Sequence, residues 1–404
     1  MGLPSCLALH ARHRDGADRR NDRREAPAEQ SGRPVRASRR LTHLASLAAL
    51  IAATALPAMA ERLRIATYNV ELSREGPGLL LRDTRIGTAP DVEAAAKVIA
   101  AAAPDVLVLK GVDYDLEGAA LGALAERIAA AGHPMAHRAA LRPNTGMATG
   151  LDLDGDGQLG GPGDAQGFGR FAGEGGMAVL SRLPLGEITD YSDFLWADLP
   201  GNLMDGAGQS PEARAVQRLS TNGHWAVQVL LDGGRNLTLL TWHATPPVFD
   251  GPEDRNGRRN HDEAAFWSRL LDGALPYAPP PAPFVLLGDA NLDPVDGEGR
   301  PAAIRALLAD PRLQAPRLTS AGGTEAARLQ GGANAAQRGD PAEDTADWAD
   351  DPGPGNLRAS VILPSAGPAV DAAGVFWPET GQPLADEVAA ASRHHLLWVD
   401  LDLP

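Results

Sequence analysis

The residues of this sequence that could do chemistry are polar side chains at the ends of apolar, strand-like runs. Asn69 ends RLRIATYN, His243 ends NLTLLTWH, Asp289 and Asn291 follow FVLLG, and His394 precedes LLWVDLDL. Loops at strand ends place reactive side chains on a rigid scaffold. Any one of them alone is more often a turn residue, because Asn and Asp form local hydrogen bonds in turns. Together they form a constellation that predicts an active site.

A second acidic motif lies in LDLDGDGQLGGPGD. Asp152, Asp154 and Asp156 occupy positions 1, 3 and 5 before Gly157, which is the front half of a calcium-binding loop. The bidentate glutamate of position 12 is absent, and a glycine stands there, followed by Asp164. The motif predicts a structural Ca²⁺ site in a long insertion, and the alternative is an acidic turn that binds no ion.

The elements that must position the constellation alternate between strand-like and helix-like patterns. Strands are predicted at 62–69, 105–109, 177–181, 224–231, 236–243, 284–289, 360–364 and 396–403. Helices are predicted at 91–103, 117–131, 263–273 and 301–309. Several strands are adjacent in the chain, which favours two packed sheets with helices outside them over one parallel sheet. The Gly-, Ala-, Pro- and Asp-rich stretch 319–356 predicts a mobile surface excursion.

The amino-terminal 60 residues differ from the rest. The composition of residues 1–34 predicts disorder or an extension upstream of the true start. Residues 35–60 contain arginines, then the apolar run LASLAALIAATALPA, then an AMA cleavage motif. This order predicts a signal peptide. A transmembrane helix is the competing interpretation, but the apolar run is short. We therefore expect export to the periplasm or outside the cell, no membrane span after cleavage, and one domain over 61–404. The only cysteine, Cys6, lies in the part removed.

The charge of the expected mature chain restricts its partners. Residues 61–404 hold 47 acidic and 27 basic side chains, a net charge of −20. Binding of long nucleic acid relies on clustered Lys and Arg, so this balance argues against it. It leaves room for a small phosphoester held with a divalent cation, and it leaves the oligomeric state open.

Six segments, in order, resemble the endonuclease/exonuclease/phosphatase superfamily of metal-dependent phosphoesterases. They are RIATYNVEL, PDVLVLKGVDYD, GEGGMAVLSRLPL, HATPPVFDGPEDRNGRRNHDE, FVLLGDANLDP and SRHHLLWVDL. The fourth segment resembles an exported bacterial subgroup. The resemblance spans about 62–403 and implies an α/β fold: a deoxyribonuclease-like, four-layer sandwich of two sheets with flanking helices.

The resemblance also implies roles for the strand-end residues. Asn69 would belong to the metal-side network, and His243 would contact the scissile phosphate. Asp289 would orient or deprotonate the attacking water, Asn291 would support the pentacoordinate phosphorus, and His394 would bind or protonate the phosphate. Phosphoryl transfer needs such donors, a carboxylate and a cation such as Mg²⁺. The sequence also contains a basic run, made of Arg255, Arg258 and Arg259. This run indicates either a fork that binds a substrate phosphate or a solvated basic loop.

Three positions depart from the superfamily pattern. Gly111 stands where a strand would end in the glutamate that binds magnesium, which leaves a hole in the ligand set. Ser360 replaces an expected aspartate. Arg393 replaces the aspartate that would orient His394, and a cation there should lower the pKa of this histidine. These losses predict weakened hydrolysis.

Compensation is conceivable from carboxylates two residues along the strands. Asp113 has this relation to Gly111, and Glu71 has it to Asn69, so either could approach a displaced cation. Arg393 could instead supply positive charge to a phosphate. The sequence thus indicates a phosphoester hydrolase, with a non-catalytic phosphate-binding protein and a secreted nuclease as alternatives.

Overall fold

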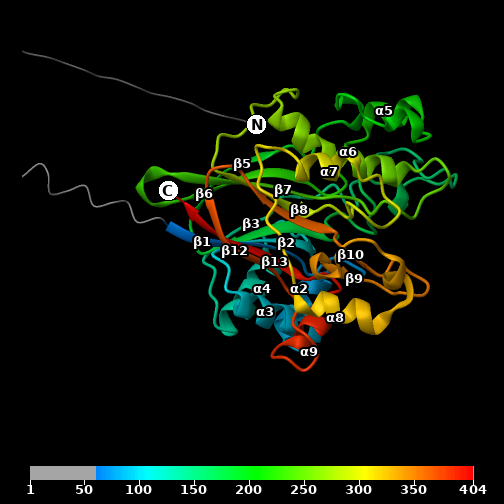
Figure 1. The fold of residues 1–404 in the computed structure, drawn as a ribbon. Helices are drawn as coiled ribbons and strands as arrows, with labels where there is room; N and C mark the ends of the chain where they lie inside the picture. Colours follow the sequence, from blue (N-terminus) through cyan, green and yellow to red (C-terminus); the bar gives the residue numbers. More distant parts are fainter. Residues whose placement is uncertain (1–60, 404) are drawn as a thin grey trace, which may run out of the picture. The chain divides into compact units, whose positions relative to one another are not determined.

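Two β-sheets form the centre of residues 61–403, the part of the chain that the computed structural model describes (Figure 1). The six-stranded sheet has the order β12-β13-β1-β2-β4-β3, and the five-stranded sheet has the order β11-β8-β7-β6-β5. The first sheet contains β1 (Glu61–Asn69), β2 (Val106–Val112), β3 (His137–Ala139), β4 (Gly176–Ser181), β12 (Ala369–Phe376) and β13 (Leu396–Leu403). The second contains β5 (Leu185–Asp190), β6 (His224–Leu230), β7 (Asn236–His243), β8 (Phe284–Asp289) and β11 (Ser360–Pro364).

Helices cover the outer face of each sheet, as Figure 1 shows. The longer helices are α2 (Leu79–Ile86), α3 (Pro90–Ala102), α4 (Ala119–Ala130), α6 (Arg255–Leu271), α7 (Ala302–Leu308), α8 (Ala321–Gln330) and α9 (Ala385–Ala391). One apolar cluster joins α3, α4 and α9 to the first sheet, a second joins α6 and α7 to the second sheet, and a third fills the space between the sheets. The expected two-sheet sandwich is confirmed. None of the helices in the described part of the chain is long and apolar enough to cross a membrane.

Strand direction brings the candidate residues to one end of the sandwich. β1 runs parallel to β2 and antiparallel to β13, so Asn69 ends its strand near the place where β13 begins. β7 runs parallel to β8, with His243 opposite Asp289 in the register. β11 is antiparallel to β8 and places Ser360 opposite Asp289. The polar residues therefore converge because each pairing places their strand ends at the same edge.

Two expectations about elements were wrong. The helix predicted at 263–273 begins at Arg255, because the polar first turns of α6 pack against loops through their buried side chains. The stretch 319–356 is not without structure: it holds α8, with Ser320 as its N-cap, and the strands β9 (Ala346–Asp347) and β10 (Asn356–Leu357). The predictions for the upstream extension, signal peptide and Cys6 lie outside the described residues.

Candidate active site

Asp289 is the centre of the cluster of strand-end residues. Its side chain is 1% exposed, and its Oδ2 accepts a hydrogen bond from Asn69 Nδ2 at 2.8 Å. Its Oδ1 accepts from the backbone N–H of Asn291 at 3.1 Å. Burial acts to raise the pKa of Asp289, but the two nearby histidines and these hydrogen bonds hold it below the ordinary value. The structure therefore places an ionised carboxylate behind the site.

Two histidines flank this carboxylate. His243 Nε2 lies 3.8 Å and His394 Nδ1 lies 3.5 Å from Asp289 Oδ2. Burial lowers the pKa of His243 to about 4, although the charge of Asp289 opposes that shift. A neutral imidazole beside an ionised carboxylate can take up a proton, since the carboxylate stabilises the imidazolium that forms. The ring of His394 also packs edge-on against Trp348, with centroids 5.3 Å apart.

A cavity of about 1190 Å³ opens in front of this cluster. Four of the five predicted catalytic and network residues line it, namely Asn69, His243, Asn291 and His394, while Asp289 lies behind them. Asn291 has a φ of 45° and is held there by its Nδ2–H bond to the Ala244 carbonyl at 2.8 Å. A non-glycine residue in this conformation is strained, and such strain is often found at functional sites.

The backbone at position 111 has a conformation that favours glycine. Gly111 has a φ of 72°, and the register of β2 on β4 shifts between Lys110 and Val112. A Cβ at this position would lie 2.7 Å from Asn69 Oδ1 and 2.9 Å from the Glu71 nitrogen. A hollow of about 480 Å³ does adjoin Gly111, but a side chain there would point at Asn69 and Glu71. The hollow lies where the missing glutamate was expected to leave a hole, although a Cβ added to this backbone would be crowded by Asn69 and Glu71.

The sequence matches the model of the Endonuclease/Exonuclease/phosphatase family over residues 66–394. The chain belongs to the endonuclease/exonuclease/phosphatase family. Its fold is similar to that of an endonuclease/exonuclease/phosphatase from Beutenbergia cavernae DSM 12333, at 21% identity and a TM-score of 0.50, over 85% of this chain and 72% of that one.

Two further solved structures are similar to this family member. One is an endonuclease/exonuclease/phosphatase family protein from Leptotrichia buccalis C-1013-b, at 15% identity and a TM-score of 0.47, over 84% of this chain and 100% of that one. The other is sphingomyelinase C from Streptomyces griseocarneus, at 17% identity and a TM-score of 0.44, over 84% and 99%. Among curated proteins none matches. These similarities concern the fold alone.

The carboxylates that could hold the divalent cation of this family are already engaged. Glu71 lies against Arg393, whose Nε donates to Oε1 at 3.1 Å and whose backbone N–H donates to Oε2 at 2.9 Å. Ser392 Oγ also donates to Glu71 Oε2, at 3.1 Å. Burial acts to raise the pKa of Glu71, but the hydrogen bonds and charge of Arg393 lower it overall. Glu71 is thus an anion whose lone pairs are occupied.

Asp113 and Ser360 do not complete a metal site either. The Asp113 carboxylate accepts from the backbone N–H groups of Arg74 and Gly175, at 2.9 and 3.0 Å, and it does not line the cavity. Ser360 is buried at the start of β11 and offers no carboxylate. Asp113 accepts two backbone hydrogen bonds that join loops and lies outside the cavity, so the structure gives no support to the conceivable compensation by Asp113. Among residues 61–403, only Asp152, Asp154 and Asp156 form a group of three such ligands.

The residues at the active site therefore do not fit the divalent cation that family members generally use. Magnesium needs several oxygen ligands in near-octahedral geometry, and carboxylates usually supply the charge. Here glycine stands at position 111, Glu71 is ion-paired, and Asp289 accepts from two amides.

Of the three arginines predicted to form a phosphate fork, Arg255 and Arg259 line the cavity and Arg258 does not. Arg259 is buried and donates to the carbonyls of Leu219 at 2.9 Å and Arg218 at 2.7 Å. Arg258 donates to the Glu253 carbonyl at 3.0 Å and does not line the cavity. Arg255 lines the cavity and uses Nη1 to hold the Leu153 carbonyl at 2.8 Å. Arg259 lines the cavity as well, so the run is no solvated loop, and the predicted phosphate fork is reduced to Arg255 and Arg259, which lie on the same helix.

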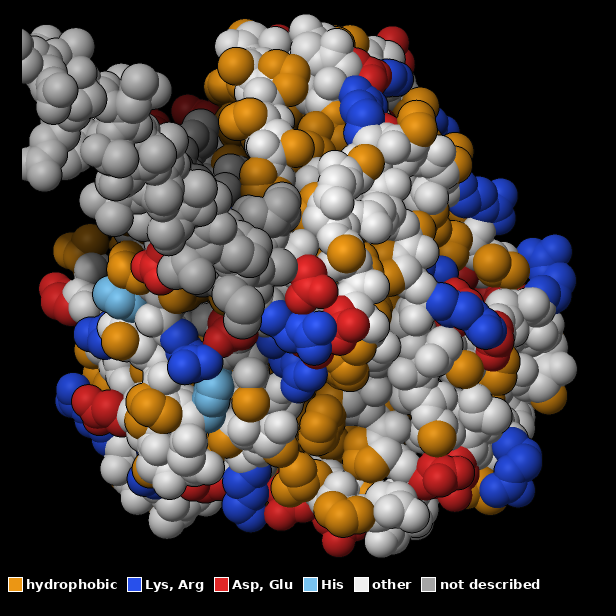
Figure 2. Space-filling view, turned by 60° about the vertical axis from the view of Figure 1, so that its left-hand side comes forward, with side chains coloured by type: hydrophobic (Ala, Val, Ile, Leu, Met, Phe, Trp, Pro, Cys, Tyr) orange, Lys and Arg blue, Asp and Glu red, His pale blue; other side chains and the backbone are white. Residues whose placement is uncertain are grey.

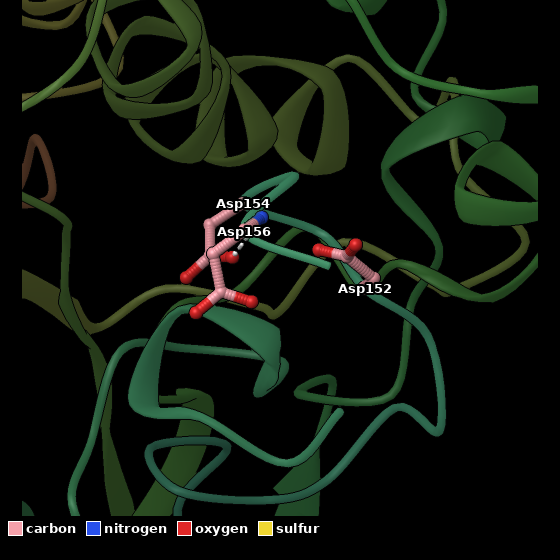
Figure 3. Close-up of side chains that lie close together, drawn as sticks. All are labelled: Asp152, Asp154 and Asp156. Carbon is pink, nitrogen blue, oxygen red and sulfur yellow. Dashed lines mark hydrogen bonds between the residues drawn. The ribbon is translucent and has the colours of Figure 1, made fainter. Parts of the chain in front are cut away.

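The acidic motif at 152–164 is brought together only in part. The carboxylates of Asp152, Asp154 and Asp156 come within 4.8 Å of one another on an exposed loop (Figure 3). Asp164 is buried and does not join them; its oxygens accept from Leu153 N at 2.7 Å and Gly161 N at 3.1 Å. Asp164 organises the loop, so its expected role as a calcium ligand is wrong.

One buried group of the site escaped the sequence analysis. Lys110 is fully buried, and its Nζ donates a hydrogen bond to Thr67 Oγ1. The pattern that could have found it is the alternation of β2, in which Val106, Val108 and Lys110 share one face. A lysine on the inward face of an apolar strand requires an explanation, because a buried ammonium is costly unless other charges compensate for it.

Proposed function

We propose that this family member hydrolyses a small phosphoester by direct attack of water on phosphorus. The observation that supports this most is the pair of histidines within 4 Å of the buried Asp289 carboxylate, at the wall of a large cavity. The family acts on phosphoesters, and the cavity has the size of small-molecule sites.

In this proposal the phosphoryl group lies against His243, Asn291 and His394, which all line the cavity. The water oxygen forms a bond to phosphorus while the bond to the leaving oxygen breaks. His243 or His394 receives the water proton, and the charge of Asp289 stabilises the imidazolium that forms. The proton then passes to the leaving group. Asp289 is assigned this indirect role because it is 1% exposed.

The test compares hydrolysis of p-nitrophenyl phosphate and bis(p-nitrophenyl) phosphate by the full chain and by Asp289→Asn. We expect kcat/KM to fall on the order of 10²- to 10⁴-fold, the range for loss of acid–base catalysis. Asp232→Asn, an exposed aspartate on a loop between β6 and β7, is the matched control and should leave the rate unchanged. Equal rates in wild type and D289N would refute the assignment.

A second candidate function is binding of a phosphorylated ligand without turnover. The engaged Glu71 and the glycine at position 111 favour it, because both remove ligands for a catalytic cation. Tight phosphate binding with no hydrolysis of either substrate would select this function.

A nuclease acting on long nucleic acid has less support. On the face that Figure 2 shows, Lys and Arg side chains are interspersed with Asp and Glu and form no basic stripe. Such proteins bind through clustered positive charge. We propose that the chain is exported, on the basis of its amino-terminal sequence, and acts on small phosphoesters in the periplasm or outside the cell.

A further inference from the structure

The cavity in front of the catalytic cluster has an aromatic rim. Among residues 61–403, the only exposed phenylalanines are Phe249, which is 89% exposed, and Phe168, which is 70% exposed. Both line this cavity, although they belong to loops that are far apart in the chain. Burial of such rings is favourable in water, and exposed apolar groups that gather at one opening are typical of a binding site. The rim is therefore suited to an apolar ligand group.

The fold holds Phe249 in its exposed position. This residue has a φ of 69°, a left-handed conformation that a bulky side chain rarely adopts. Asn256, in the first turn of α6, binds the residue on each side of it: the Asn256 backbone N–H donates to the Asp250 carboxylate, and Nδ2 donates to the Val248 carbonyl at 2.7 Å. Strained conformations persist where the surroundings impose them, and they are common at ligand clamps. The loop thus presents the Phe249 ring in a fixed place.

An apolar wall, made of Pro247, Leu292 and Leu357, continues the lining inside the cavity. A Cβ added to Gly299 would lie 2.3 Å from Leu292 Cδ1 and 3.2 Å from Pro247 Cγ, so these two side chains meet over that glycine. Leu357 comes from β10, and its Cδ1 would lie 3.4 Å from a Cβ at Gly297. Three separate segments of the chain therefore supply apolar atoms to the same cavity.

The apolar lining reaches the catalytic residues themselves. Leu292 directly follows Asn291, whose side chain is held by the Ala244 carbonyl at 2.8 Å. Trp348 also lines the cavity, and its ring packs edge-on against His394 with centroids 5.3 Å apart. A phosphoryl group at the two histidines would thus have apolar surface directly beside it, which an ester group on the same phosphorus could cover.

We propose that the substrate is a phosphoester of an apolar alcohol, whose alkyl or aryl group lies along the apolar wall and between the rim residues Phe168 and Phe249. The inference rests on the proposed function and deepens it, since it names the substrate class of the same site. The cavity of about 1190 Å³ has room for more than a phosphate group. Burial of the organic group against the wall and the two rings supplies binding energy that a bare phosphate lacks.

The test is isothermal titration of the full chain with methylphosphonate, hexylphosphonate and phenylphosphonate, in MgCl₂ and in EDTA. Their carbon–phosphorus bonds are not esters, so binding is measured apart from hydrolysis. We expect hexylphosphonate or phenylphosphonate to bind at least tenfold more tightly than methylphosphonate. Phe168→Ala and Phe249→Asn should each reduce this ratio at least threefold; asparagine is chosen because it tolerates the left-handed conformation. Leu116→Ala is the matched control, since Leu116 is 82% exposed and lies outside the cavity lining.

The outcomes also separate this inference from the proposed function. Equal affinity for the three phosphonates, or binding of none of them in either solution, would overturn the inference, as would a ratio that both phenylalanine variants retain. Tighter binding of an apolar phosphonate without hydrolysis of p-nitrophenyl phosphate or bis(p-nitrophenyl) phosphate would sustain the apolar subsite and defeat the proposed hydrolase. Hydrolysis of either ester with equal affinity for the three phosphonates would do the reverse.

Discussion

Placing a side chain at position 111 should destabilise the fold and create no metal ligand. Gly111 has a left-handed φ of 72°, a conformation that costs an L-residue about 1 to 2 kcal/mol. A Cβ would also lie 2.7 Å from Asn69 Oδ1 and 2.9 Å from the Glu71 nitrogen, so these groups must move. Forced packing of this kind costs about 1 to 3 kcal/mol. Gly111→Ala should therefore lower the free energy of unfolding by about 2 to 5 kcal/mol.

The matched control is Gly118→Ala. Gly118 has a φ of 64°, and nothing lies within 4 Å of its added Cβ, so only the backbone cost applies. Urea unfolding of wild type, G111A and G118A gives the contact cost as the difference between the two variants. Equal stability of G111A and G118A would show that Asn69 and Glu71 do not close the position.

The same reasoning applies to Gly111→Glu. This variant should be at least as unstable as G111A and should gain no magnesium affinity, because its side chain points at Asn69 and Glu71. A G111E protein that is as stable as wild type and binds Mg²⁺ in a calorimetric titration would refute the argument. Such a result would mean that β2 relaxes to a regular strand when the side chain is supplied.

Three further predictions concern other parts of the chain. Burial lowers the pKa of His224 to about 4, so this histidine takes up a proton at a higher pH in the unfolded chain than in the native one. The free energy of unfolding should therefore fall by up to about 3 kcal/mol as the pH drops from 6.5 to 4. Urea unfolding across this range should show a shallower pH slope for His224→Gln, and an identical slope would contradict the assignment. Calcium chloride should raise the Tm of wild type and not that of Asp154→Asn, whose carboxylate belongs to the acidic cluster; no rise in wild type would remove the predicted Ca²⁺ site. Amino-terminal sequencing of protein secreted by an expressing bacterium should begin near Glu61, and an intact amino terminus would refute export.

The sequence by itself predicted the two-sheet sandwich and the polar residues that end its strands. Apolar runs such as those that end at His243 and Asp289 indicate buried segments, and short buried runs of this kind predict strands. A polar residue at the end of such a run lies where the strand ends and a loop begins. The convergence of Asn69, Asp289 and His394, in contrast, depends on the pairing and packing of strands that are far apart in the chain.

Only the tertiary structure decided what these residues contact. The pairing of Arg393 with Glu71 and the use of Arg259 for backbone carbonyls depend on residues distant in the chain. The contacts of Asp164 with Leu153 and Gly161 depend on the folding of its own loop. Long charged side chains have many rotamers, so spacing in the sequence does not determine the position of the charged group. The left-handed Gly111 is likewise a consequence of the shifted register of β2 on β4, a contact between strands about 65 residues apart. Whether a site is poor or rich in cations is thus set by the fold, because electrostatic balance depends on distances in space.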